Sequence, residues 1–130
     1  MNNNKIDLLN FSVICCCYNS EKYILETLLS IKNQSYKNYE IIIVNDGSKD
    51  NTSNIINIFI KKNKDIKIKF IEQENKGLAE SRNIAIKNSS YPWISIIDHD
   101  DLWEINKLEE QVKDIKNNED IRLFFSDFKY

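Results

Sequence analysis

The sequence predicts an α/β protein with a mainly parallel sheet and helices on both faces. Short apolar runs rich in β-branched residues alternate with longer segments in which apolar residues recur at helical spacing. Several of these runs end in polar or turn-forming residues, as strands do where they leave a sheet. Because strands separated by helices of about ten or more residues form parallel sheets, we predict the order β-α-β-α-β-α-β-α-β.

Five segments are expected to be strands, at residues 11–18, 39–44, 67–73, 93–97 and 121–128. The segment Tyr39–Val44 is the plainest of them, since a continuous β-branched run is typical of a strand buried on both faces. The fourth strand is also expected to lie in the interior of the sheet, with Ile94, Ile96 and Ile97 buried.

Four helices are expected between the strands. Ser20 is a candidate cap for the first, and either Asp50 or Ser53 opens the second. The third covers Leu78–Lys87. The fourth follows the acidic residues after the fourth strand and places its apolar positions on one side, at Ile105, Leu108, Val112 and Ile115.

Composition limits the possible functions. The 130 residues suffice for a single domain, 1–130, with residues 1–10 as a flexible leader. The net charge of -2, with lysines spread along the chain, gives no case for nucleic acid or an anionic membrane. Free thiols at Cys15–Cys17 indicate a reducing, cytoplasmic location, and any membrane association would depend on segments outside this sequence. A single histidine, His99, argues against a zinc site or a Cys-His nucleophile.

The strongest local signal is acidic. The apolar run at 94–97 ends in Asp98, Asp100 and Asp101, three carboxylates within four residues. Carboxylates this close repel one another unless a cation neutralises them, and their oxygens suit Mg²⁺ or Mn²⁺. A simpler explanation is an acidic turn favoured by the dipole of the following helix.

Two further polar segments should meet this cluster, because the carboxyl ends of parallel strands share one edge, where ligands bind. Tyr18 could stack on a base or ribose, and Asp46 could accept a hydrogen bond from an imide N–H, as in uracil, or from a ribose hydroxyl. Arg82 could pair with a diphosphate. The simpler alternatives are a strand-end aromatic residue, a plain Asp-Gly turn and a helix-surface arginine.

Four ordered blocks, SVICCCYN, YEIIIVNDGSKDNT, NKGLAESRNIAI and WISIIDHDDLW, strongly resemble the N-terminal half of family 2 glycosyltransferases, which have the GT-A (Rossmann-like) fold. The resemblance covers about residues 11 to 128 and implies a site for a nucleotide-diphosphate sugar, most commonly a UDP-sugar. It places Cys16, Tyr18 and Asp46 around the base, with Glu21 near it. Arg82 and Asn83 would border the donor.

The same resemblance makes Asp98 and Asp100 the D-x-D pair. Asp100 would be the direct ligand of Mn²⁺ or Mg²⁺ and Asp98 would lie nearer the ribose, while Asp101 would cap the following helix. Two positions depart from the family pattern: Cys16-Cys17 replaces Pro-Thr, and Asn45 replaces the first of two aspartates. A thiol is a poorer hydrogen-bond partner than a hydroxyl, which would weaken a base contact there.

Family members commonly continue into an acceptor-binding half that carries the general base. We therefore expect this chain to be truncated at its C-terminus, with no catalytic residue of its own and the base beyond Tyr130. The whole protein would transfer a sugar, with inversion, to an acceptor hydroxyl in bacterial cell-surface polysaccharide or glycoconjugate synthesis.

Alternative functions remain open. The first is a non-catalytic nucleotide or nucleotide-sugar binding module. A response-regulator-like domain would need an acidic pair after the first strand, where this chain has Cys-Cys-Tyr-Asn. A nucleotidyltransferase would need a glycine-rich basic loop there, and neither a G-x-G-x-x-G nor a P-loop motif occurs. The sequence names neither the sugar nor the acceptor.

Overall fold

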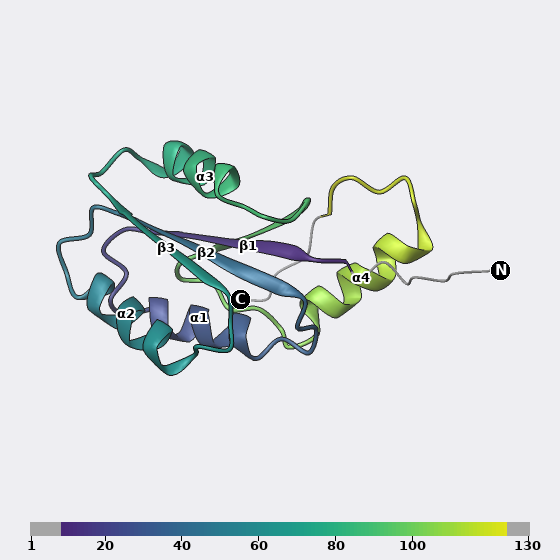
Figure 1. Cartoon of the computed structure of the whole chain (residues 1–130), viewed down its shortest axis with the longest axis horizontal. Helices are drawn as coiled ribbons and strands as arrows, with labels where there is room; N and C mark the ends of the chain where they lie inside the picture. The colour runs from purple at the N-terminus through teal and green to yellow at the C-terminus, as the bar shows by residue number, and fades with distance from the viewer. Residues whose placement is uncertain (1–8, 125–130) are drawn as a thin grey trace.

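Four strands and four helices alternate along residues 9–124, the part of the chain that the computed structural model describes (Figure 1). The strands are β1 (Phe11–Cys17), β2 (Tyr39–Asp46), β3 (Ile68–Gln73) and β4 (Trp93–Asp98). The helices are α1 (Ile24–Lys32), α2 (Thr52–Lys62), α3 (Leu78–Lys87) and α4 (Lys107–Asn117). Within residues 9–124, no helix combines the length and apolar character needed to cross a bilayer.

The strands form one sheet in the order β3-β2-β1-β4, and every neighbouring pair is parallel. In this register Cys16 lies opposite Val44 on one side and Asp98 on the other, while Asp46 lies opposite Gln73. All four strands therefore end at the same edge of the sheet.

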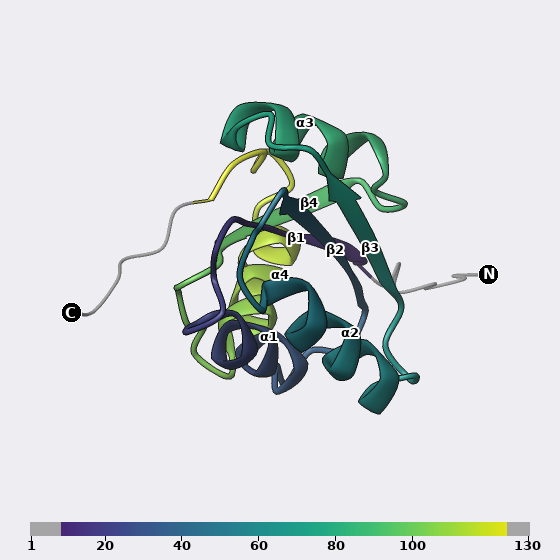
Figure 2. The same cartoon turned by 90° about the vertical axis from the view of Figure 1, so that its left-hand side faces the viewer.

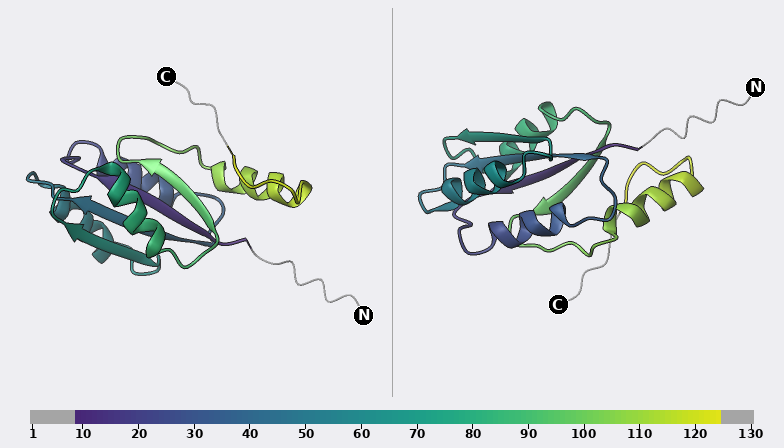
Figure 3. Two further views of the ribbon diagram at one scale, coloured as in Figure 1. Left: turned by 90° about the horizontal axis from the view of Figure 1, so that it is seen from above. Right: turned by 60° about the horizontal axis from the view of Figure 1, so that its bottom comes forward.

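Helices cover both faces of the sheet, as predicted (Figure 2). Alternate residues of β1 explain the two layers. Val13 and Cys15 pack in the larger core with residues of α1, α2 and α4, whereas Ile14 and Cys16 pack with Ala85 of α3 on the other face. Helix α4 extends beyond the amino ends of the strands, away from the edge where the strands end (Figure 3).

The prediction that the fourth strand is an interior strand is wrong for the sheet formed by residues 9–124. Strand β4 lies at the edge of that sheet. Ile97 is buried, Ile94 is half-buried, and Ile96 remains 47% exposed. Ile96 is on the same face as its register partner Ile14, but α3 packs against β1 and β2 and leaves β4 uncovered there.

The structure gives different results for Asp50 and Ser20, the two residues expected to lie at the starts of helices. Asp50 Oδ1 accepts a hydrogen bond from the backbone N–H of Thr52, the first residue of α2, so Asp50 stabilises the start of that helix. Helix α1 begins only at Ile24, and Ser20 contributes its carbonyl to the preceding turn while its hydroxyl donates to Tyr18. Ser20 is therefore no side-chain cap.

The segment after β4 also differs from expectation. Asp101 does not cap a helix, because α4 begins at Lys107 after an irregular stretch. The carbonyls of His99 and Asp101 instead accept hydrogen bonds from the Thr27 hydroxyl of α1. Of the predicted strand at 121–128, residues 121–124 form no strand and the remainder lies outside the described residues, as does most of the expected leader.

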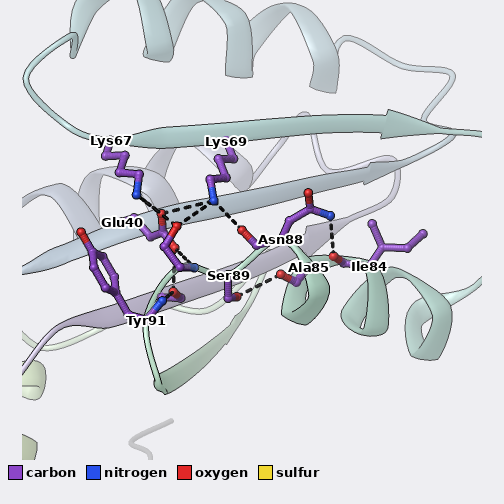
Figure 4. A network of polar contacts seen from close by, with 10 residues as sticks. Glu40, Lys67, Lys69, Ile84, Ala85, Asn88, Ser89 and Tyr91 are labelled. Atoms are coloured by element: carbon purple, nitrogen blue, oxygen red, sulfur yellow. Dashed lines mark hydrogen bonds and ion pairs between the residues drawn. The ribbon is translucent and has the colours of Figure 1, made fainter.

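A buried carboxylate links the strands near their amino ends, opposite the edge where the strands end (Figure 4). Glu40, near the start of β2, has no exposed surface, and its Oε1 accepts hydrogen bonds from Ser12 Oγ at 2.7 Å and from the backbone N–H of Ser90 at 2.6 Å. Its Oε2 lies 2.9 Å from Lys67 Nζ and 3.7 Å from Lys69 Nζ. Glu40 thus joins three strands to the loop before β4.

Candidate functional site

A cavity of about 430 Å³ opens at the edge of the sheet where the strands end. The ends of β1, β2 and β4 and the start of α3 all contribute to its wall. Its lining residues are Cys16, Cys17, Tyr18, Asp46, Asn75, Gly77, Leu78, Ser81, Asp98, His99 and Asp100. The polar segments expected to converge do lie around one space.

Of the residues predicted for the site, the structure brings five to this cavity: Cys16, Tyr18, Asp46, Asp98 and Asp100. Arg82 does not line it but reaches its rim through an ion pair with Asp98. Glu21 and Asn83 are exposed and lie outside the lining. Glu21 instead accepts a hydrogen bond from the backbone of Asn51.

Asp46, at the end of β2, is the most constrained polar residue of the cavity. It is 5% exposed, and its Oδ1 accepts hydrogen bonds from Gln73 Nε2 and the backbone N–H of Lys76, both at 2.8 Å. Its Oδ2 accepts one from the backbone N–H of Gly77 at 2.9 Å. Burial raises the pKa of Asp46, but these hydrogen bonds outweigh it and hold the pKa below its usual value.

These contacts leave Asp46 with limited capacity for a ligand. Each carboxylate oxygen has two lone pairs. Both positions of Oδ1 are taken, by Gln73 and Lys76, and Oδ2 accepts from Gly77. A hydrogen bond from the Ser81 side chain also lowers the pKa of this carboxyl. At most one acceptor position therefore remains, on Oδ2.

The turn after β2 touches the turn after β3. Gly47 has φ of +76°, and a Cβ added there would lie 2.7 Å from the backbone nitrogen of Asn75. The Asn75 side chain also donates to the Asp46 carbonyl at 3.1 Å. Glycine is needed at position 47 both for its backbone angle and for this close approach.

The acidic side of the cavity carries concentrated negative charge. Burial, followed by the charges of Asp98 and Asp100, raises the pKa of Asp101. Arg82 Nη2 lies 2.9 Å from Asp98 Oδ1 and offsets part of this charge. Among residues 9–124, no three His, Cys, Asp or Glu side chains are placed to hold a metal ion together. Asp98 and Asp100 fit Mg²⁺ or Mn²⁺ where phosphate oxygens and water complete the ligand set.

The thiols at the end of β1 are protonated at neutral pH. Burial is the main cause that raises the pKa of Cys16 to about 11, although Arg82 opposes it. Burial likewise raises the pKa of Cys17 to about 12, and its Sγ donates to the Val44 carbonyl at 3.5 Å. Cys16 is therefore a weak neutral donor facing the cavity.

The prediction from sequence missed one wall of the site. Its members are Asn75, Gly77, Leu78 and Ser81, in the turn after β3 and at the start of α3. Gln73, at the end of β3, supports this wall through its hydrogen bond to Asp46. The signal was present, because the third predicted strand also ends at this edge and an Asn-Lys-Gly turn follows it. The placement of this wall beside Asp46 depends on side-chain contacts, which the order of the strands alone does not predict.

The parallel sheet with helices on both faces is shared with the solved glycosyltransferases described below, which have the GT-A fold. Residues 12–126 match Glycosyl transferase family 2, and the chain belongs to that family. A relative in Bacillus subtilis, TuaG, named as a glycosyltransferase of teichuronic acid biosynthesis, is 37% identical over 102 residues, which are 78% of this chain and 40% of TuaG.

Solved structures agree with this assignment. TarS 1-349 from S. aureus, in complex with UDP, superposes with a TM-score of 0.76 at 32% identity, covering 84% of this chain and 32% of that one. The mannosyltransferase PcManGT from Pyrobaculum calidifontis, in complex with GDP-Man and Mn²⁺, gives a TM-score of 0.78 at 27% identity, covering 82% and 32%. The chain thus spans about a third of these structures and less than half of TuaG.

Proposed function

We propose that residues 9–124 bind the donor of a metal-dependent glycosyltransferase and that this donor is a UDP-sugar. The observation that carries the proposal is that the Asp46 carboxylate lines the same cavity as Tyr18, Asp98 and Asp100. In this arrangement Asp46 would bind the base, and Asp98 and Asp100 would hold the metal ion for the diphosphate at the other end of the same cavity.

The acceptor capacity of Asp46 favours uracil over guanine. Uracil presents one N–H between two carbonyls, so one free lone pair on Oδ2 suffices. Guanine presents two N–H groups that a carboxylate binds with both oxygens, and Oδ1 is already saturated by Gln73 and Lys76. The Tyr18 ring, 46% exposed, is available to stack on the base. The protonated Cys16 thiol can donate weakly to a base carbonyl.

The diphosphate would lie at the acidic side of the cavity. Asp98 and Asp100 would hold Mn²⁺ or Mg²⁺, which neutralises the charge that develops on the departing diphosphate. Arg82, already beside Asp98, would turn to a phosphate oxygen, since a guanidinium suits phosphate oxygens. Together these residues orient the donor and stabilise its leaving group.

The proposal for the whole protein goes further. It transfers the sugar, with inversion, to an acceptor hydroxyl in the synthesis of a cell-surface polysaccharide or glycoconjugate. The name of TuaG supports this kind of acceptor, and the resemblance to the family supports inversion. The described residues are assigned only the donor side of this reaction.

The test is calorimetric titration of this chain with UDP and with GDP, each with and without Mn²⁺. We expect metal-dependent binding of UDP, weaker binding of GDP, and loss of the metal-dependent part in Asp100→Ala. Asp114→Ala, which removes an exposed carboxylate from α4, is the matched control and should bind as the wild type does. Equal binding of UDP with and without Mn²⁺ would contradict the metal role, and preference for GDP would contradict the assignment of the base.

A further inference from the structure

Two loops that border the cavity hold each other through reciprocal hydrogen bonds. The loop after β1 contributes Asn19–Glu21, and the loop after β2 contributes Ser48–Thr52. Ser48 Oγ accepts a hydrogen bond from the backbone N–H of Asn19 at 2.9 Å. In return, Asn19 Oδ1 accepts one from the backbone N–H of Lys49 at 2.8 Å. We call these two segments and their shared contacts the loop bridge.

Further along the same two loops, Glu21 and Asp50 form a second pair of reciprocal hydrogen bonds. Asp50 Oδ2 accepts from the backbone N–H of Glu21 at 3.1 Å, and Glu21 Oε2 accepts from the backbone N–H of Asn51 at 3.0 Å. Between them, Thr52 Oγ1 accepts from the backbone N–H of Ser20 at 2.8 Å. Hydrogen bonds to carboxylates are stronger than those between neutral groups, so the two acids contribute much of the bridge.

The loop bridge fixes the backbone beside Tyr18. Asn19, the next residue, has φ of +48°, a left-handed conformation that a non-glycine residue adopts only when its surroundings hold it there. Both the backbone N–H and the side chain of Asn19 are tied to the opposite loop. Tyr18 itself is 46% exposed, so core packing alone does not define where its ring lies.

We propose that Glu21 is a positioning residue that acts on donor binding through Tyr18 and does not touch the donor. The proposal rests on the proposed function, since it needs a nucleotide in the cavity. It reassigns Glu21, which was expected beside the base but lies outside the cavity lining, with its carboxylate directed to the Asn51 backbone. Asp50 has the matching role from the other loop, and it also accepts a hydrogen bond from the backbone N–H of Thr52 at the start of α2.

The test is a double-mutant cycle on the dissociation constant for UDP with Mn²⁺. We expect Glu21→Ala to weaken binding about fivefold, the equivalent of one hydrogen bond. In a Tyr18→Ala background the same change should cost less than about twofold, because the ring that Glu21 positions is gone. Glu21→Gln, which keeps an oxygen acceptor for Asn51, should restore most of the affinity. Glu26→Ala, an exposed acid on α1, is the matched control.

Penalties that multiply in the double variant would overturn the proposal, because Glu21 would then act on the donor independently of Tyr18. A wild type that binds no UDP is a different result, since it removes the proposed function and the positioning role with it. Thermal melting of each variant reports folding. If Glu21→Ala fails to fold, Ser48→Ala breaks the same bridge at the Asn19 backbone, and its penalty should likewise vanish without Tyr18.

Discussion

Arg82 Nη2 of α3 lies 2.9 Å from Asp98 Oδ1 at the end of β4. The two side chains are 35% and 55% exposed, so the pair contributes less than about 1 kcal/mol to stability. A pair this weak separates readily when a stronger partner arrives. Under the proposed function, Asp98 would exchange Arg82 for a metal ion, which would free the guanidinium for the diphosphate.

This exchange predicts how Arg82→Ala behaves. With Mn²⁺ present, we expect the variant to bind UDP about tenfold more weakly, the cost of a hydrogen bond to a charged group. Uridine, which has no phosphate, should bind both proteins equally in the same calorimetric experiment. Lys87→Ala, an exposed cation at the end of α3, is the control. An equal loss for uridine would show that Arg82 supports the base pocket instead.

Asp46→Asn should damage both stability and binding. An amide has one oxygen where the carboxylate has two, so it cannot accept from Gln73, Lys76 and Gly77 with the same geometry. We expect a loss of about 1–3 kcal/mol in the free energy of unfolding, measured by urea denaturation. UDP binding should be lost under conditions in which the variant is folded. Unchanged stability would contradict the described hydrogen-bond set.

Gly47→Ala tests the contact between the turns after β2 and β3. The new methyl group would lie 2.7 Å from the backbone nitrogen of Asn75, at a residue with φ of +76°. We expect the free energy of unfolding to fall by about 1–3 kcal/mol. Asn54→Ala, at an exposed position of α2, should change it by less than about 0.5 kcal/mol. A stable Gly47→Ala variant would mean that the two turns lie further apart.

Glu40 should make stability depend on pH in the acid range. Burial raises its pKa, but hydrogen bonds from the Ser90 backbone, Lys67 and Ser12 lower it to about 2 from an ordinary value of 4.5. A pKa depressed in the folded state stabilises the fold above the unfolded value, and this stability is lost as pH falls from about 5 toward 2. The full contribution is about 3 kcal/mol.

Urea denaturation across this pH range checks the expectation. Other carboxylates also titrate there, so the quantity to compare is the slope for the wild type against that for Glu40→Gln, which should be shallower. Glu119→Gln, an exposed control, should keep the slope of the wild type. Identical slopes for all three proteins would rule out a depressed pKa at Glu40.

Local patterns were sufficient to predict most of the elements, because apolar periodicity is a property of the segment itself. Helix α3 has the predicted bounds, Leu78–Lys87. The predicted burial of Ile96 is wrong because its exposure depends on which helix covers which strand. The predicted helix cap at Asp101 is wrong. In the sequence, acidic residues ahead of a helix resemble a cap whether the helix begins at once or, as here, only at Lys107.

The same difference between local patterns and tertiary contacts applies to the candidate site. Parallel topology alone brought Tyr18, Asp46 and Asp98 to one edge of the sheet. The contacts that decide what each residue can still bind come from loops about 30 residues away, as with Lys76 on Asp46 or Asn51 on Glu21. No spacing in the sequence encodes these contacts.

The position of β4 gives the two ends of the cavity different rigidity. Tyr18 follows β1 and Asp46 ends β2, and each of these strands has a neighbour on both sides. Hydrogen bonds also hold the Tyr18 carbonyl and the Asp46 carboxylate. Asp98 ends β4 and Asp100 follows it, and within residues 9–124 this strand is paired only with β1. The segment after it is held to α1 by the Thr27 hydroxyl. Local opening is easier where fewer contacts must break. Under the proposed function, the part of the cavity for the base would therefore be the more rigid, and the acidic part would adjust its distance to diphosphates that carry different sugars.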